Sequence, residues 1–185
     1  MVAVSALWLP ILLSAVVVFI ASSLMHMLLT YHSSDYTALP NEDKVRDVLR
    51  PANLKPGLYV IPHCTHKEMR TPAILEKYKH GPVGFLTILP NAVPNMPKFL
   101  IQWFVFCLLI GFFVAYLTGH TVPREAHYLA VFRVAGTAAF LAYGLGNLSN
   151  GIWKGQRWSA TIKEVVDGLI YGLLTAGCFG WLWPR

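Results

Sequence analysis

The sequence predicts an all-α membrane protein with four transmembrane helices and a small ordered α+β cap between the first two helices. Of the 185 residues, 55% are hydrophobic and only 13% are charged, whereas an average soluble domain has about 25% charged residues. Apolar runs that are long enough to cross a bilayer recur along the chain. The segment between the first two runs is too long for a simple connection, so we expect it to fold.

The predicted spans are residues 7–29, 99–117, 128–148 and 165–183. The first has no basic flank and is longer than the apolar stretch of a cleavable signal peptide, so we expect a retained anchor. The chain then divides into a first helix (1–29), a cap (30–98) and three further helices (99–185). The short connection between the second and third spans makes those two helices antiparallel neighbours.

Basic residues indicate the orientation of the spans. Two loops carry most of them: Lys44, Arg46, Arg50, Lys55, Lys67, Arg70, Lys77, Lys79 and Lys98 in the first, and Lys154, Arg157 and Lys163 in the second. Only Arg124 and Arg185 stand opposite. Because Lys and Arg beside a span stay on the cytoplasmic side, we expect both termini outside and both large loops in the cytoplasm. In size and topology the chain resembles small bacterial inner-membrane proteins, which implies a multi-pass protein of that membrane.

Small residues recur at a spacing of four in three of the spans. Such stripes allow close approach of helices in lipid. They comprise Gly111, Ala115 and Gly119 in the second span, Ala138, Ala142 and Gly146 in the third, and Gly168, Gly172, Ala176 and Gly180 in the fourth. Two uses are compatible with this glycine-zipper pattern: packing within a four-helix bundle, and docking of at least one stripe onto another subunit or a second copy.

Four polar residues fall near the cytoplasmic ends of the spans once the alternating helix directions are taken into account: His26, Gln102, Asn147 and Asp167. An ionisable group at membrane depth is a candidate functional site. We pair His26 with Asp167. The alternative is a structural hydrogen bond at the membrane boundary, with Asp167 reaching water or capping its own helix near Lys163.

The cap has signals for two helices and one ribbon. Residues 41–50 start at Asn41, carry acids in the first turn and stop at proline, while residues 71–80 start with Thr71 and Pro72 and end before Gly81. The β-prone runs 57–62 and 84–90 could pair as a two-stranded ribbon, which must lean on the helices or the membrane because an isolated ribbon is marginal in water.

A tight cluster in the cap, His63, Cys64 and His66, offers imidazole and thiolate groups that suit zinc, copper or iron. The cluster lacks a fourth ligand at a recognisable spacing, and adjacent residues point oppositely on an extended strand. Contacts of these side chains with lipid headgroups or a partner are the competing interpretation. No cofactor is strongly indicated.

Motifs that would identify an activity are missing. There is no phosphate-binding glycine loop, nucleophile elbow or HExxH sequence, and basic residues are interleaved with acids, which argues against nucleic-acid binding. We therefore expect a protein that acts by interaction with the bilayer and other membrane subunits, as a structural or accessory subunit of a larger complex, rather than an enzyme. The alternative is a small transporter or a metal-, haem- or quinone-binding membrane protein that uses the polar site at the inner face. Binding of the basic cap to anionic lipid is compatible with either.

Overall fold

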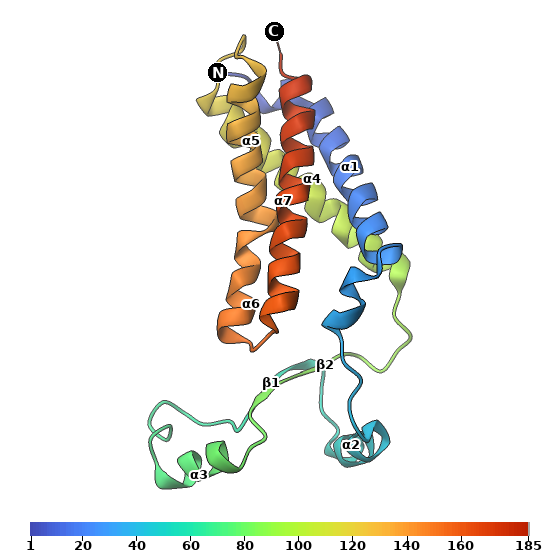
Figure 1. The fold of residues 1–185 in the computed structure, drawn as a ribbon, viewed down its shortest axis with the longest axis vertical. Coiled ribbons are helices and arrows are strands. Elements are labelled where there is room, and N and C mark those ends of the chain that lie inside the picture. The colour runs from blue at the N-terminus through green and yellow to red at the C-terminus, as the bar shows by residue number, and fades with distance from the viewer. Residues whose placement is uncertain (185) are drawn as a thin grey trace. The chain divides into compact units, whose positions relative to one another are not determined.

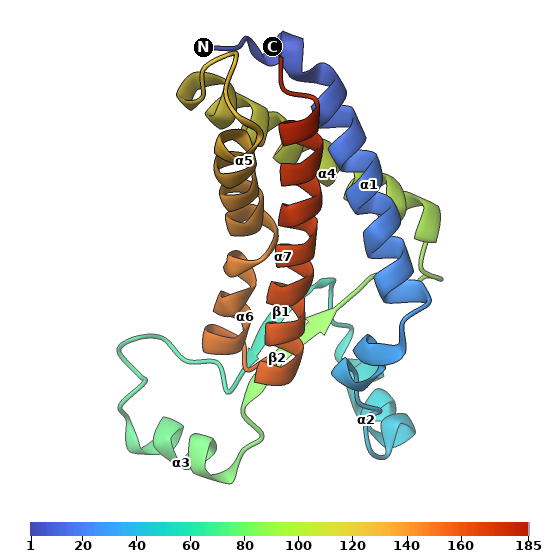
Figure 2. The same cartoon turned by 45° about the horizontal axis from the view of Figure 1, so that its top comes forward.

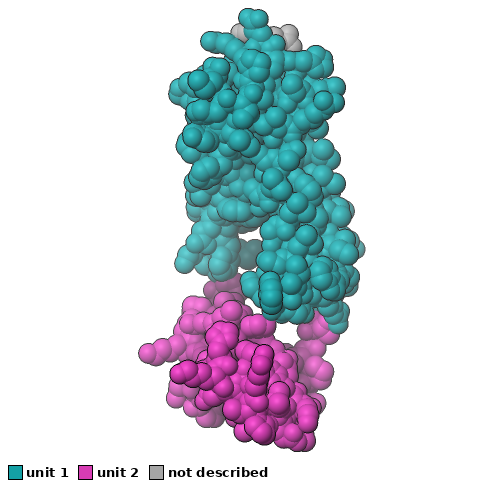
Figure 3. Space-filling model, turned by 90° about the vertical axis from the view of Figure 1, so that its left-hand side faces the viewer, with its two compact units in different colours: residues 1–36, 95–185 teal, residues 37–94 magenta. Residues whose placement is uncertain are grey.

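The computed structural model describes residues 1–184, which are mostly helical with one two-stranded sheet. The chain divides into two compact units, coloured separately in Figure 3. The first is helical and comprises Met1–Tyr36 together with the chain from Asn95 onward. The second is Thr37–Pro94. The first contains every helix of membrane-spanning length.

Four long helices build the first unit (Figure 1): α1 (Trp8–Met27), α4 (Met96–Thr121), α5 (Tyr128–Tyr143) and α7 (Trp158–Trp181). Shorter elements flank them: η1 (Val4–Leu7), η2 (Thr30–Asp35), η4 (Leu145–Asn147) and α6 (Leu148–Trp153). Each long helix packs against two others, in the order α1, α4, α5, α7 and back to α1. The most extensive pairing is between α5 and α7, which lie side by side in Figures 1 and 2.

Both ends of the described chain lie beside the α4–α5 connection. The amide of Val2 donates to the carbonyl of Gly119 at 2.8 Å, and the indole nitrogen of Trp183 donates to the carbonyl of Pro123 at 2.9 Å. The C-terminal end of α1 and the N-terminal ends of α4 and α7 therefore lie at the opposite end of the helices (Figure 1).

Three helical segments are long and apolar enough to cross a membrane: Val4–Met27, Met96–Thr121 and Tyr128–Trp153. The fourth predicted span lies in α7, which begins earlier than expected, at Trp158. This helix is not among the three, because Lys163, Glu164 and Asp167 in its first half lower its hydropathy. The chain is thus a membrane-like helical protein with three apolar candidate spans.

The third predicted span, residues 128–148, is interrupted and does not form a single continuous α-helix. Helix α5 ends at Tyr143, a single 3-10 turn follows, and α6 completes the segment. The break lies at Gly144, whose backbone is in close contact with Gly168 of α7. Glycine is a poor helix former, so a helix is readily interrupted at such a residue.

The small residues of α7 pack against α5 within the chain. A Cβ added to Gly172 would lie 3.1 Å from Phe140, and one added to Gly180 would lie 2.6 Å from the ring of Tyr128. Ala176 is fully buried, and its Cβ would lie 3.0 Å from a Cβ added to Gly136. Close approach of backbones is what small residues provide in membrane helices.

The buried face of α5 is displaced from the predicted one. Its buried residues are Val131, Ala135, Ala139 and Tyr143. Of the predicted stripe, Ala138 is half-buried, Ala142 is exposed, and Gly146 lies in the 3-10 turn with open space around it. The spacing of four was present in both sets of residues, so spacing alone did not fix which face packs.

The small residues of α4 pack toward α1 and the N-terminal segment. A Cβ on Gly111 would lie 3.3 Å from Ile11, and one on Gly119 would lie 2.5 Å from the carbonyl oxygen of Val2. Ala115 between them is fully buried. The predicted small-residue faces of α4 and α7 are therefore both covered by this chain itself.

The second unit contains α2 (Glu42–Leu49), η3 (Arg50–Ala52), β1 (Gly57–Ile61), α3 (Pro72–His80) and β2 (Gly84–Ile88). The two strands pair antiparallel, with Tyr59 opposite Leu86. The side chains of Asn41 and Thr71, the residues at which the two predicted helices start, do not cap them. Asn41 adopts a left-handed conformation, and the hydroxyl of Thr71 donates to the carbonyl of Glu68 instead.

Candidate functional site

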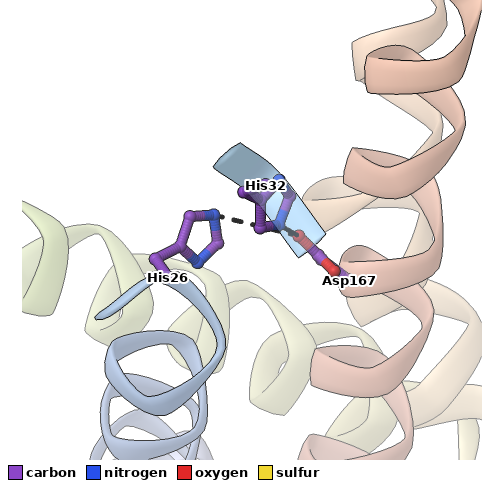
Figure 4. A group of neighbouring side chains, drawn as sticks. All are labelled: His26, His32 and Asp167. Atoms are coloured by element: carbon purple, nitrogen blue, oxygen red, sulfur yellow. Dashed lines mark hydrogen bonds and ion pairs between the residues drawn. The ribbon is translucent and has the colours of Figure 1, made fainter. Parts of the chain in front are cut away.

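The candidate site is centred on the carboxylate of Asp167, which is 3% exposed in the first half of α7. Its Oδ2 atom lies 2.8 Å from Nε2 of His32 and 3.8 Å from Nε2 of His26. Its Oδ1 atom accepts a hydrogen bond from the hydroxyl of Tyr31. Figure 4 shows both imidazole rings directed toward this carboxylate, His26 from the end of α1 and His32 from the segment after it.

Helix η2 places His32 and Asp35 on one face. In a 3-10 helix, side chains three residues apart eclipse one another, and Oδ2 of Asp35 accordingly lies 2.6 Å from Nδ1 of His32. The other oxygen of Asp35 lies 2.7 Å from Nζ of Lys163. Lys163 also donates to Oγ of Ser34 at 2.9 Å and to the carbonyl of Tyr31. One lysine of α7 thus fastens the η2 turn over the site.

Asp35 is a carboxylate under ordinary conditions. The hydrogen bond from Lys163, helped by His32, holds the pKa of Asp35 below its usual value of 3.8 despite partial burial. A carboxylate can only accept a hydrogen bond, so Nδ1 of His32 carries a proton. The other ring nitrogen, Nε2, lies 2.8 Å from Oδ2 of Asp167.

His26 has the same arrangement. Its Nδ1 atom lies 3.0 Å from the carbonyl oxygen of Ser22, one helical turn earlier in α1. Since a carbonyl is also only an acceptor, Nδ1 donates and Nε2 faces Asp167. The rings of His26 and His32 stack, with centroids 4.3 Å apart and planes inclined by 14°. The side chain of His26 is 50% exposed, whereas that of His32 is 12% exposed.

A cavity of about 460 Å³ adjoins the cluster, within the range typical of small-molecule sites. His26, Asn147, Glu164 and Asp167 lie at its polar part. Its other lining residues are Ser22, Ser23, Met27, Met96, Leu100, Trp103, Phe106, Ala142, Tyr143 and Tyr171. All four long helices or the segments joined to them contribute, so the cavity is a property of the folded helical unit.

Aromatic rings form much of the cavity wall and hold one another in place. Tyr143 and Tyr171 make an edge-to-face contact with centroids 5.6 Å apart, and Phe106 meets Tyr143 edge-to-face at 6.1 Å. The indole nitrogen of Trp103 donates to Oγ of Ser22 at 2.8 Å, which fixes that ring against α1. Such contacts favour a preformed wall of defined shape.

Two polar atoms of the lining residues are buried without a hydrogen-bond partner among residues 1–184: the hydroxyl of Tyr171 and Oε2 of Glu164. The other oxygen of Glu164 accepts from the side-chain amide of Gln156 at 2.7 Å. Buried polar atoms normally have a partner, and leaving one unpaired costs about 1–3 kcal/mol. Each of these two atoms therefore has an unused capacity for a hydrogen bond.

The predicted inner-face residues do not all gather. His26 and Asp167 meet, and Asn147 lines the same cavity while its amide nitrogen donates to the carbonyl of Tyr143 at 3.0 Å. Gln102 is exposed on α4 and does not line the cavity. Its neighbour Trp103 faces the cavity instead, a difference of one position in helical phase.

The three proposed ligands in the cap are not brought together. His63 and His66 are exposed, and Sγ of Cys64 lies 3.8 Å from the hydroxyl of Tyr78. Within the described chain, the group of histidine, cysteine and acidic side chains close enough to hold a metal ion is His26, His32 and Asp167.

Sequence reasoning missed His32, Tyr31, Asp35 and Lys163 as parts of this site. The spacing of three between His32 and Asp35 could have indicated that these two side chains interact. Their position beside α7, however, depends on the direction the chain takes after α1. Comparison with known proteins adds no assignment: no family model matches the chain, and neither the curated proteins nor the solved structures contain a significant match.

Proposed function

We propose that this chain is an integral membrane protein that binds a small amphipathic ligand of the quinone class in the cavity beside Asp167. The observation that carries the proposal is the combination of an aromatic wall with an unpaired buried donor. Trp103, Tyr143 and Tyr171 offer a surface for a planar ring, and the hydroxyl of Tyr171 lacks a partner among the described residues. A quinone carbonyl would accept from that hydroxyl.

The membrane supports this choice of ligand. A quinone is apolar enough to partition into lipid, and three helices of this unit are apolar enough to span it. We propose that α7 is a fourth span, since its 24 residues would measure about 36 Å. Its charged first half is shielded because Asp167 is buried and Lys163 pairs with Asp35. Four crossings, an even number, would place both ends of the chain on the same side of the membrane. This agrees with the position of both ends beside the α4–α5 connection.

We further propose a multi-pass protein of the bacterial inner membrane with both termini outside and both large loops in the cytoplasm. The distribution of lysine and arginine supports this orientation. The cavity and the His26–Asp167 pair would then lie toward the cytoplasmic face.

The interpretation as an accessory subunit stays a prediction. It was motivated by small-residue stripes, but those of α4 and α7 are covered by α1, the N-terminal segment and α5 of this chain. The cavity is a specific feature of the fold that an accessory role would leave unexplained. Ligand binding is therefore the function that the geometry supports best.

The test is binding of 2-methyl-1,4-naphthoquinone to the purified full-length chain in lipid nanodiscs, measured by isothermal titration calorimetry. Ala142→Phe should abolish binding because the new ring would occupy the cavity, whereas Leu141→Phe, an exposed neighbour outside the lining, should not. Tyr171→Phe should weaken binding about 5- to 30-fold, the loss expected for a buried hydrogen bond of about 1–2 kcal/mol. Equal binding by wild type and Ala142→Phe would contradict the proposal.

A further inference from the structure

We propose that His26, His32 and Asp167 bind a divalent first-row transition-metal ion through the two Nε2 atoms and a carboxylate oxygen. The three ligand atoms lie within 4.8 Å of one another. Ligand atoms of a tetrahedral zinc site are about 3.3 Å apart when the metal–ligand bonds are about 2.0–2.1 Å. The observed separations of 2.8 Å and 3.8 Å from Asp167 fall on either side of that value. Small side-chain rotations would therefore complete the site.

The surroundings of both imidazoles are those of metal ligands. Histidines that bind metals almost always donate their other ring nitrogen to a carboxylate or a carbonyl, which fixes the tautomer and the ring orientation. His32 donates from Nδ1 to Asp35, and His26 donates from Nδ1 to the carbonyl of Ser22. Both Nε2 lone pairs are consequently left facing the same carboxylate.

A positive charge between these groups would stabilise their convergence. Two nitrogen lone pairs and a carboxylate oxygen are all acceptors, and they repel one another unless a proton or a cation lies between them. A proton between His32 and Asp167 would satisfy the 2.8 Å contact but would not engage Nε2 of His26, which lies 3.8 Å from the same carboxylate. A single metal ion satisfies all three acceptors.

The local charge suits a divalent ion. Asp167 is the only acid in direct contact with both Nε2 atoms in the described structure, and Asp35 is neutralised by Lys163. Two imidazoles and one carboxylate favour zinc, iron or cobalt over calcium or magnesium, which prefer oxygen ligands. Oδ1 of Asp167 is held by the hydroxyl of Tyr31, so that carboxylate is oriented from its far side.

Three protein ligands leave a coordination position open, as in catalytic metal sites. His26 and Asp167 also line the cavity, so the metal would lie at its polar edge. The metal site stands on its own geometry, and it can be present whether or not an organic ligand occupies the cavity.

The experiment titrates Zn²⁺ and Co²⁺ into the chelator-treated full-length protein in nanodiscs. We expect one high-affinity ion per chain and, for Co²⁺, visible absorption bands of a four- or five-coordinate site. His32→Gln and Asp167→Asn should each weaken binding more than 10-fold. Asp35→Asn, which replaces the carboxylate that both His32 and Lys163 contact, should weaken it about 10- to 100-fold.

His120→Gln is the matched control. Like His26, this histidine donates from Nδ1 to a carbonyl one turn earlier in its own helix, that of Tyr116 at 2.7 Å, but it is exposed near the C-terminal end of α4. Its substitution should leave Zn²⁺ affinity unchanged. A dissociation constant in the millimolar range for wild type, or tight binding that survives both His32→Gln and Asp167→Asn, would overturn the proposal.

A wild-type measurement covers the case in which the variants do not fold. The ¹⁵N resonances of Nε2 in His26 and His32 should shift strongly on addition of one equivalent of Zn²⁺, while those of Nδ1 keep the signature of a protonated nitrogen. Unchanged Nε2 resonances under saturating Zn²⁺ would also overturn the proposal.

Discussion

Replacement of Gly168 by alanine should separate α5 from α7 at their closest approach. A Cβ at this position would overlap Cα of Gly144 and would lie 2.5 Å from its nitrogen and 2.7 Å from the carbonyl carbon of Tyr143. All of these atoms belong to backbone, which cannot rotate away as a side chain can. Ordinary contact would require the helices to part by about 1 Å in a region packed at interior density.

The expected cost is about 1–3 kcal/mol of the free energy of unfolding, the usual range for overpacking a close contact. The higher end applies because α5 and α7 form the most extensive helix pair. The displacement of the backbone at position 168 should also disturb the candidate site, because Asp167 is the preceding residue. Unfolding in mixed detergent micelles, followed by circular dichroism, measures the free-energy change.

Gly177→Ala is the matched control in the same helix. The nearest atom to its added Cβ is the hydroxyl of Tyr128 at 4.0 Å, so no shift is required. Alanine is also the better helix former by about 1 kcal/mol in water. We expect Gly177→Ala to be neutral or stabilising. Gly168→Ala of wild-type stability would refute the claim that backbone contact at Gly144 holds these helices together.

Two further predictions concern the cap and the orientation. The carboxylate of Glu68 accepts from the backbone amide of Thr65 at 2.9 Å, and this bond holds its pKa below the usual 4.5. The turn should therefore be stabilised above that pH and lose this contribution as pH falls through the folded-state pKa, so Glu68→Gln should speed amide exchange at Thr65 at neutral pH only. For the orientation, cysteines introduced at Thr121 and Ser149 in a Cys64→Ser background should react with an impermeant maleimide from opposite sides, the first from outside. Reaction of both from one side would contradict four crossings.

The apolar helices could be predicted from the sequence because hydropathy over a long window depends little on tertiary contacts. Three segments of membrane-spanning length are confirmed. Helix α7 departs from this rule, since its buried Asp167 and paired Lys163 lower its hydropathy although both have partners in the fold. A hydropathy average gives a charged residue the same value whether or not the residue has a partner in the folded protein.

Helical phase was harder to predict than helix position. In α5 the packed face includes Ala135 and Ala139 rather than the predicted Ala138 and Ala142, and in α4 the cavity receives Trp103 rather than Gln102. Spacing of four identifies a stripe but not the neighbour it faces. Between α5 and α7, the faces that meet are those of Gly144 and Gly168, whose backbones are in close contact.

The positions of His32 and Asp35 in the site depend on a reversal of the chain after α1 that has no strong signal in the sequence. His26 and Asp167 could be placed at a common depth because successive helices alternate in direction. His32 reaches the same carboxylate only because Leu28 and Leu29 end α1 and the 3-10 turn folds back toward α7. No periodicity reports such a reversal, so the second imidazole and its partner Asp35 could be found only from the structure.

The most direct test of ligand binding is native mass spectrometry of the full-length chain released from its own membrane. We predict that wild type retains a small organic molecule, that Leu141→Phe retains it, and that Ala142→Phe loses it. A chain that carries no such molecule and instead emerges in a stoichiometric complex with other membrane subunits would contradict the account and support an accessory role.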